Sequence, residues 1–152
     1  MTASVKNLEA FQASTANLQA AQLIGKRVEA SGNKLTIRGE TVSEGFYQLS
    51  SPGKVLVKIF DAGGNLVRII DAGQKDTSKQ KLVWDGKNQR GTTLPEGTYT
   101  FQVLAQDEKK NTVPVHTYRV GTVSGVSFEN GKAYLNLGGD LVSISDIIAI
   151  QA

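Results

Sequence analysis

The chain has 152 residues, a length that predicts one ordinary domain or two small ones. Its formal net charge is +3 and it has no blocks of basic residues, so neither a nucleic-acid-binding nor a membrane-binding surface is indicated. The absence of Cys excludes disulfides, thiolate metal sites and a Cys nucleophile. A single His, His116, excludes multi-His zinc sites and leaves one candidate for the base of any catalytic triad.

The first 24 residues differ from the rest because they contain neither Gly nor Pro and are rich in Ala and Gln. They also lack the apolar region of a secretory signal peptide. Alternating steps of three and four residues place five of them on one side of a helix: Leu8, Phe11, Thr15, Leu18 and Gln22. We predict a helix over residues 4–23, ended by Gly25 as a left-handed C-cap.

The apolar side of this predicted helix is thin, with only three large residues: Leu8, Phe11 and Leu18. We call these three residues the N-terminal stripe. An isolated helix of this kind is marginal in water, so it either frays or packs on a partner. The stripe is therefore our candidate face for contact with a sister subunit or another protein.

After Gly25 the apolar period changes from 3.6 to 2 residues. Val28, Leu35 and Ile37 lie on either side of a Ser-Gly-Asn turn, which predicts one hairpin or a pair of short strands. Further alternating segments with Gly, Pro, Asp and Asn turns between them predict an antiparallel sandwich over residues 42–111. Its strands are expected at 46–49, 55–60, 66–70, 82–84 and 98–105, with a polar loop at 72–79.

The C-terminal part is also expected to be β. Residues 112–120 are strand-like but contain Pro114, which cannot donate to a ladder, so this strand lies at an edge or crosses between domains there. Asn130-Gly131 between alternating segments is the strongest hairpin signal in the chain. The longest uninterrupted apolar run, 147–150, has four residues, whereas a transmembrane helix needs about 20.

No segment carries a convincing catalytic, cofactor or metal motif. His116 is expected to be a surface or half-buried strand residue, and Gly121–Gly125 lacks the central Ser of a nucleophile elbow. Residues 85–88 lack the spacing of a calcium loop and are interpreted as an Asp-Gly turn. Gly63-Gly64 lacks phosphate-loop spacing and precedes no helix. We therefore predict that the chain is not an enzyme and holds no cofactor or metal.

Four motifs in sequence order resemble bacterial flagellar hook-capping proteins, also called hook assembly scaffolds or basal-body rod modification proteins. The first is LQAAQLIGKRV at 18–28, and the second is KIFDAGGNLVRII at 58–70. The third combines WDGKNQRG at 84–91 with LPEGTYT at 94–100. The fourth combines LGGD at 137–140 with SDIIAI at 145–150. The resemblance covers about residues 5–152.

The resemblance implies a mainly β architecture in three parts. The N-terminal helix occupies 1–25, and a tudor-like (SH3-like) β-barrel is built from 26–40 and 113–152, with a fibronectin type III-like β-sandwich inserted at 42–111. Within the sandwich, Trp84 belongs to the family motif, and Leu94, Pro95 and Tyr99 resemble a tyrosine corner. Three aromatic residues of the barrel segments are expected to be core and surface residues rather than a methyl-lysine cage: Tyr118, Phe128 and Tyr134.

The resemblance also implies a function without covalent chemistry. The chain is expected to act as a homo-oligomer at the distal end of the growing hook, where it helps hook-protein subunits polymerise after its export by the flagellar type III apparatus. Its partners are then the hook protein and other copies of itself, with no nucleic acid and no membrane. Family members carry a longer N-terminal region, so we expect the chain to be a fragment. The alternative is an Ig-like accessory or sorting module of a secreted bacterial protein, which residues 42–111 alone would fit.

Overall fold

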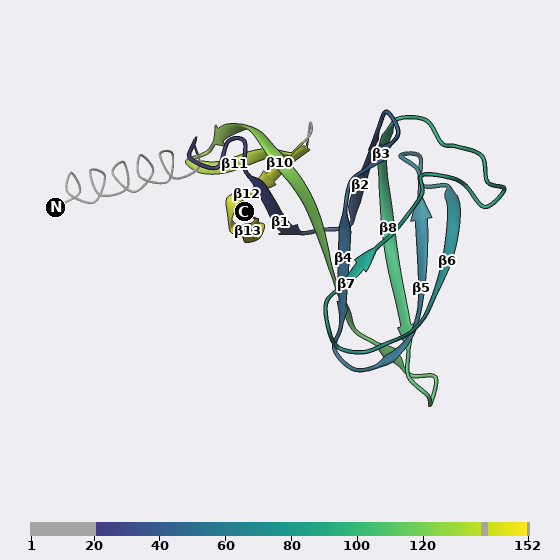
Figure 1. Cartoon of the computed structure of the whole chain (residues 1–152). Helices are drawn as coiled ribbons and strands as arrows, with labels where there is room; N and C mark the ends of the chain where they lie inside the picture. Colours follow the sequence, from purple (N-terminus) through teal and green to yellow (C-terminus); the bar gives the residue numbers. More distant parts are fainter. Residues whose placement is uncertain (1–20, 138–139, 152) are drawn as a thin grey trace. The chain divides into compact units, whose positions relative to one another are not determined.

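The computed structural model describes residues 21–137 and 140–151 and is mainly β (Figure 1). The chain divides into two compact units. One, the inserted unit, comprises Ser31–Val120, and the other, the terminal unit, comprises the residues up to Ala30 and from Gly121 onward. The N-terminal stripe and the predicted helix up to residue 20 lie outside the described residues, so the structure does not test them. Gly25, the predicted left-handed residue after the helix, has a φ of 86°.

The inserted unit consists of two antiparallel sheets around one core. In the larger sheet the strand order is β3-β2-β8-β5-β6, and β9 pairs with β8. In the smaller sheet β4 pairs with both β7 and β10. The strands are β2 (Lys34–Arg38), β3 (Thr41–Val42), β4 (Gly45–Leu49), β5 (Gly53–Phe60), β6 (Leu66–Lys75), β7 (Gln80–Leu82), β8 (Gly97–Gln106), β9 (Thr112–Val113) and the first part of β10 (Val115–Glu129).

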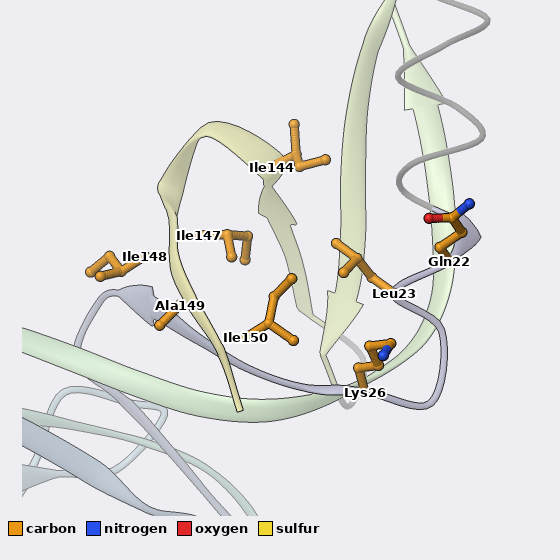
Figure 2. Close-up of a pocket in the computed structure, with 8 residues that line it drawn as sticks. All are labelled: Gln22, Leu23, Lys26, Ile144, Ile147, Ile148, Ala149 and Ile150. Carbon is orange, nitrogen blue, oxygen red and sulfur yellow. The ribbon is translucent and has the colours of Figure 1, made fainter. Parts of the chain in front are cut away.

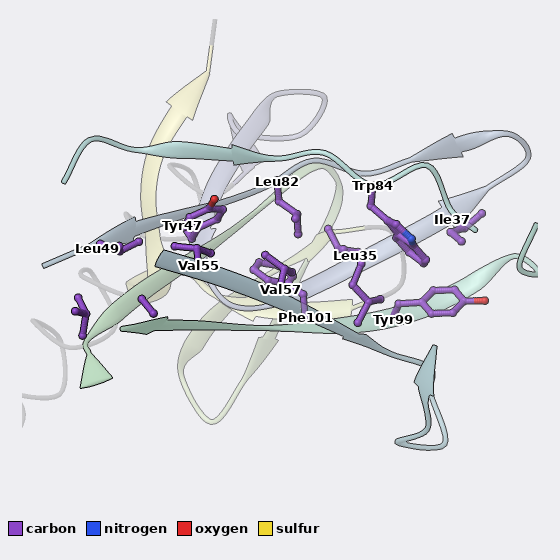
Figure 3. Close-up of a cluster of buried hydrophobic side chains, with 13 residues drawn as sticks. Leu35, Ile37, Tyr47, Leu49, Val55, Val57, Leu82, Trp84, Tyr99 and Phe101 are labelled. Atoms are coloured by element: carbon purple, nitrogen blue, oxygen red, sulfur yellow. The ribbon is translucent and has the colours of Figure 1, made fainter. Parts of the chain in front are cut away.

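The core of the inserted unit follows directly from the period-2 patterns of its strands. Val55, Val57 and Ile59 of β5 are at most 1% exposed, and the residues between them face outward. On β8, Tyr99 and Phe101 are buried in the same way. Side chains from both sheets, including Tyr47 and Leu82 of the smaller one, meet in a single cluster (Figure 3). The predicted sandwich is therefore present.

The terminal unit contains β1 (Arg27–Ser31), the second part of β10, β11 (Lys132–Leu137), β12 (Asp140–Ser143), the short 3-10 helix η1 (Ile144–Asp146) and β13 (Ile147–Gln151). The strand order is β12-β11-β10-β1-β13. Its small core is formed by seven buried residues: Val28, Ala30, Val123, Ala133, Leu135, Leu137 and Val142.

The predicted Asn-Gly hairpin joins β10 to β11. Glu129 pairs with Lys132, which leaves Asn130 and Gly131 as a two-residue loop. Both loop residues have positive φ, 53° and 77°, as a type I′ turn requires. This turn has the same twist as the strands that it connects, so the sequence signal is confirmed by the structure.

The division into two units places the strands on either side of the predicted sandwich in the inserted unit. Residues 31–40 and 113–120, which the resemblance assigns to the discontinuous barrel, lie within Ser31–Val120. Leu35 of β2 pairs with Tyr99, and Thr117 of β10 pairs with Tyr47. Of the two alternatives for residues 28–37, the pair of separate strands is correct, because β1 and β2 belong to different sheets. Alternation identifies a strand but not the strand that it pairs with.

Two local expectations also need correction. Strand β6 continues to Lys75 through residues expected to be loop, and its register with β5 shifts opposite Val55/Leu56. Strand β7 ends at Leu82, so Trp84 lies beyond it.

Pro114 follows β9, which pairs with β8 alone and so lies at a sheet edge, the first of the two expected alternatives. The chain passes between the units after Val120.

Candidate functional site

His116 lies on the exposed face of β10 in the inserted unit. Its Nε2 is 3.1 Å from the Ser31 Oγ, and its ring lies 4.6 Å from the ring of Tyr118. Sequence reasoning did not anticipate Ser31, which is 85 residues away along the chain. A Ser–His pair also needs a group that orients the imidazole. In the part of the chain that the structure describes, no carboxylate hydrogen-bonds to His116, so the pair lacks the third member of a triad.

The two loops that the sequence offers as candidate ligand sites use their polar groups for hydrogen bonds within the loop. In the Gly63-Gly64 loop, the Asp61 carboxylate accepts hydrogen bonds from the backbone N–H of Gly63 (3.0 Å) and of Asn65 (2.9 Å). The bond from Asn65 contributes most to holding the pKa of Asp61 below its usual value. Because these N–H groups already have an anionic partner, they are not available to bind a phosphate.

The Asp85–Asn88 loop is likewise a turn. The Asp85 carboxylate accepts from the backbone N–H of Lys87 (3.0 Å), and the Asn88 side-chain oxygen accepts from those of Arg90 and Thr92 (both 3.0 Å). Among residues 21–137 and 140–151, no three His, Cys, Asp or Glu side chains lie close enough together to hold a metal ion.

The three aromatic residues considered as a cage are divided between the units. Tyr118 belongs to the inserted unit, where it pairs with Phe46, and the Lys79 ammonium lies 4.9 Å from the Phe46 ring and 5.1 Å from the Tyr118 ring. Phe128 and Tyr134 belong to the terminal unit. The faces of the Phe46 and Tyr118 rings are therefore already in contact with a lysine of the chain itself, Lys79.

Trp84 and Tyr99 form a buried contact at one end of the inserted unit. Their rings meet edge to face with centroids 5.2 Å apart (Figure 3). The Tyr99 hydroxyl donates to the carbonyl oxygen of Pro95 at 2.7 Å, which is the geometry of a tyrosine corner, and the Trp84 indole N–H donates to the carbonyl of Lys87 at 3.0 Å. Because the Tyr99 hydroxyl and the Trp84 indole N–H each have a hydrogen-bond acceptor, burying the two rings leaves no polar group of theirs unsatisfied. The contact is structural in character.

The partly buried Tyr99 hydroxyl predicts a loss of stability at high pH. Burial, with a smaller contribution from the Asp61 charge, raises the pKa of Tyr99 above 10.0. Since the folded state disfavours the phenolate, the stabilisation is complete below the pKa of the unfolded chain and is lost as the pH rises through the folded pKa. Tyr99→Phe should cost about 1 kcal/mol at neutral pH and should reduce the alkaline loss.

Urea titrations at neutral pH and near pH 11 measure both effects. The fluorescence of Trp84, the only Trp, reports unfolding of the inserted unit. Tyr134→Phe in the terminal unit is the control. If wild type and Tyr99→Phe lose stability in parallel above pH 10, the assignment to Tyr99 is wrong.

The terminal unit carries an apolar groove of about 630 Å³ (Figure 2). Most of its wall comes from η1 and β13, and the rest from the segment before β1. The lining residues are Gln22, Leu23, Lys26, Ile144, Ile147, Ile148, Ala149 and Ile150. This groove is the main feature that sequence reasoning missed. The available signal was the apolar run 147–150, which we used only to exclude a transmembrane helix.

A second apolar surface lies on the outer face of the larger sheet of the inserted unit. Leu56 of β5 is paired with Leu104 of β8, and they are 41% and 38% exposed. Ile69 of the adjacent edge strand β6 is 40% exposed and pairs with Lys58, two positions along β5 from Leu56. Exposed apolar patches of this kind commonly mark contact surfaces.

Comparison with known proteins identifies the family. Residues 32–109, just over half of the chain, match the family described as FlgD Ig-like domain. The chain belongs to the FlgD family. The matched range lies entirely within the inserted unit and contains both Trp84 and the Tyr99 corner.

Curated FlgD proteins resemble the chain over a longer range. The basal-body rod modification protein FlgD of Salmonella typhimurium (strain LT2) is 29% identical over 131 residues, and that of Escherichia coli (strain K12) is 30% identical. In both cases the match covers 80% of this chain and 56% of the relative. The chain therefore spans little more than half the length of the curated FlgD proteins that it matches.

Solved FlgD structures share its fold. The crystal structure of FlgD from P. aeruginosa is 27% identical, has a TM-score of 0.74, and matches over 85% of this chain and 98% of its own. FlgD from Xanthomonas campestris, whose structure was described for the hook capping essential for flagellar assembly, is 23% identical with a TM-score of 0.77 over 88% of this chain and 98% of its own. Among the described residues, no helix is long and apolar enough to cross a membrane.

Proposed function

We propose that the chain is part of a structural scaffold that caps the tip of the growing flagellar hook and promotes polymerisation of the hook protein. The observation that carries this proposal is membership of the FlgD family. The curated relatives are basal-body rod modification proteins, and the Xanthomonas campestris structure was described in terms of hook capping. The alternative, an isolated Ig-like accessory module, is not favoured because the similarity to FlgD proteins extends over 131 residues, well beyond the inserted unit.

The proposed architecture has three parts. The strand order β12-β11-β10-β1-β13, with a 3-10 helix immediately before the last strand, supports a tudor-like (SH3-like) barrel for the terminal unit. The two packed sheets and the Tyr99–Pro95 corner support a fibronectin type III-like sandwich for the inserted unit. Residues 4–23 are proposed to form a helix ahead of them.

The proposed partners are the hook protein and further copies of this chain, at the distal end of the growing hook after type III export. A cap must hold arriving subunits and later be released, which favours modest contact surfaces over one large apolar interface. The described residues offer such surfaces: the groove of the terminal unit and the Leu56–Leu104 patch. The N-terminal stripe is proposed as the self-association face. We propose no catalytic role, cofactor, metal, nucleic acid or membrane.

Deletion and complementation of the gene that encodes this chain test the proposed function. The deletion strain should lack hooks in electron micrographs and should be non-motile on soft agar, and a plasmid copy should restore both. A plasmid copy with a stop codon early in the reading frame is the matched control for expression from the vector. Normal hooks in the deletion strain would refute the proposal.

A further inference from the structure

The groove of the terminal unit is an open side of that unit's core. Leu23, Ile144 and Ile147 are partly buried against the core cluster and also line the groove. Ile150 also lines the groove, and it pairs with Val28 across the β1–β13 ladder, so the two side chains lie on the same face of the sheet. Val28 is fully buried on this face, whereas Ile150 is 54% exposed. Figure 2 shows Leu23, Ile147 and Ile150 directed toward a common space. In the described residues nothing covers this space.

The chain itself contains a segment with the matching chemistry. The groove is lined at one end by Gln22 and Leu23, directly after the residues that lie outside the described structure. That segment carries the N-terminal stripe, and its other residues are mostly Ala and polar residues. An apolar helical stripe laid into an apolar groove is a common mode of protein recognition.

The groove is long enough for the two residues that would enter it. In a helix, Leu8 and Phe11 lie three residues, about 5 Å, apart along the axis. The five residues of β13, Ile147–Gln151, span about 13 Å in extended conformation. A volume of about 630 Å³ suits a few large side chains rather than a whole domain.

If residues 4–21 form the proposed helix, which Gln22–Gly25 follow as a turn, most of the stripe cannot reach the groove of its own chain. Phe11 is 11 residues before Gln22, which corresponds to about 16 Å of helix, and Leu8 is about 5 Å farther away. Residues 8–22 contain no Gly or Pro that would favour a reverse turn within this distance. A groove that receives Leu8 and Phe11 of the proposed helix would then belong to another molecule.

We propose that Leu8 and Phe11 of one copy bind in the Ile144–Ile150 groove of a second copy of the chain. This inference rests on the self-association part of the proposed function and names the surface that accepts the stripe. The contact is small, because two or three side chains bury much less area than a stable dimer requires. Several such contacts in one assembly hold it together, while each one opens readily, as a cap that must be displaced requires.

Disulfide trapping tests the contact directly, because the chain has no Cys of its own. The 152-residue chain with Phe11→Cys and the same chain with Ile150→Cys are mixed under mild oxidation, and the products are identified by mass spectrometry of the digested protein. A disulfide between positions 11 and 150 of different molecules is expected in large excess over the pair made with Leu141→Cys. Leu141 is a matched control because it lies in the same unit, is 48% exposed and does not line the groove.

A yield of the 11–150 disulfide no greater than that of the 11–141 disulfide would overturn the inference. So would a chain carrying both Phe11→Cys and Ile150→Cys that closes the bond within one molecule at high dilution. These outcomes leave the proposed function standing if the deletion strain lacks hooks. Conversely, normal hooks in the deletion strain would refute the proposed function whatever the disulfide yield.

Sedimentation equilibrium provides the second measurement. Ile150→Ser and Phe11→Ser should each weaken self-association at least tenfold, and Leu141→Ser should leave it unchanged. Circular dichroism checks that all three variants remain folded, which is expected since Ile150 and Leu141 are both about half exposed. Equal association of wild type and Ile150→Ser would contradict the inference.

Discussion

Trp84→Ala is expected to destabilise the inserted unit by about 3–5 kcal/mol, the usual cost of truncating a large buried aromatic residue. Trp84 is 7% exposed and packs edge to face on Tyr99. Its removal leaves a cavity in the core and deprives the Lys87 carbonyl of its hydrogen-bond donor. Because single domains are typically stable by only 5–15 kcal/mol, this one change should bring the unit close to unfolding.

Chemical denaturation followed by far-UV circular dichroism measures this effect, since the substitution removes the only Trp fluorophore. The adjacent Val83→Ala is the matched control, because Val83 is 74% exposed. It should change the free energy of unfolding by less than about 0.5 kcal/mol. Similar losses for the two variants would mean that Trp84 does not contribute to the core as the structure indicates.

Gly53→Ala is expected to destabilise the inserted unit by about 2–3 kcal/mol through overpacking. Gly53 begins β5, and a Cβ atom at this position would lie 2.7 Å from the backbone oxygen of Gln106 on β8. The clash is with backbone rather than with a flexible side chain, so relief requires β5 and β8 to move apart. These strands are neighbours in the larger sheet, and Lys54 pairs with Gln106 directly beside the clash.

The control for Gly53→Ala is Gly125→Ala on β10. No atom lies within 4 Å of a Cβ added at Gly125, and its φ is not in the left-handed region. We expect Gly125→Ala to be neutral or slightly stabilising, because it reduces the conformational freedom of the unfolded chain. Urea unfolding followed by Trp84 fluorescence measures the Gly53 variant, and circular dichroism measures the Gly125 variant. An unchanged urea midpoint for Gly53→Ala would show that the close approach is absent.

These variants separate effects on folding from effects on assembly. Trp84 and Gly53 are buried, so any loss of motility in strains that carry their substitutions is expected to follow a loss of folded protein. Ile150 and Phe11 are expected to act on assembly instead. A strain with Ile150→Ser should therefore contain normal amounts of the protein and fewer hooks, whereas one with Trp84→Ala should contain less protein.

Most strands of the inserted unit were predictable because each has one buried and one exposed face. The alternation around Val57 and Phe101 places them in the core without reference to any other strand. Asn130-Gly131 was predictable for a similar local reason, since few residue pairs tolerate two positive φ angles in succession. The apolar run 147–150 lacks such alternation, and so the sequence did not show that part of it lines a groove.

By itself, the sequence determined the mainly β class, most strands of the inserted unit, the hairpin turn and the resemblance to flagellar hook-capping proteins. All of these depend on local patterns of residue type. Only the tertiary structure decided that residues 31–40 pair within the inserted unit, that Ser31 meets His116, and that the terminal unit leaves one side of its core open. The physical reason is that strand pairing and the closure of a core depend on contacts between residues far apart in the chain. An apolar residue at every second position shows which face of a strand is buried, but not which strand lies beside it.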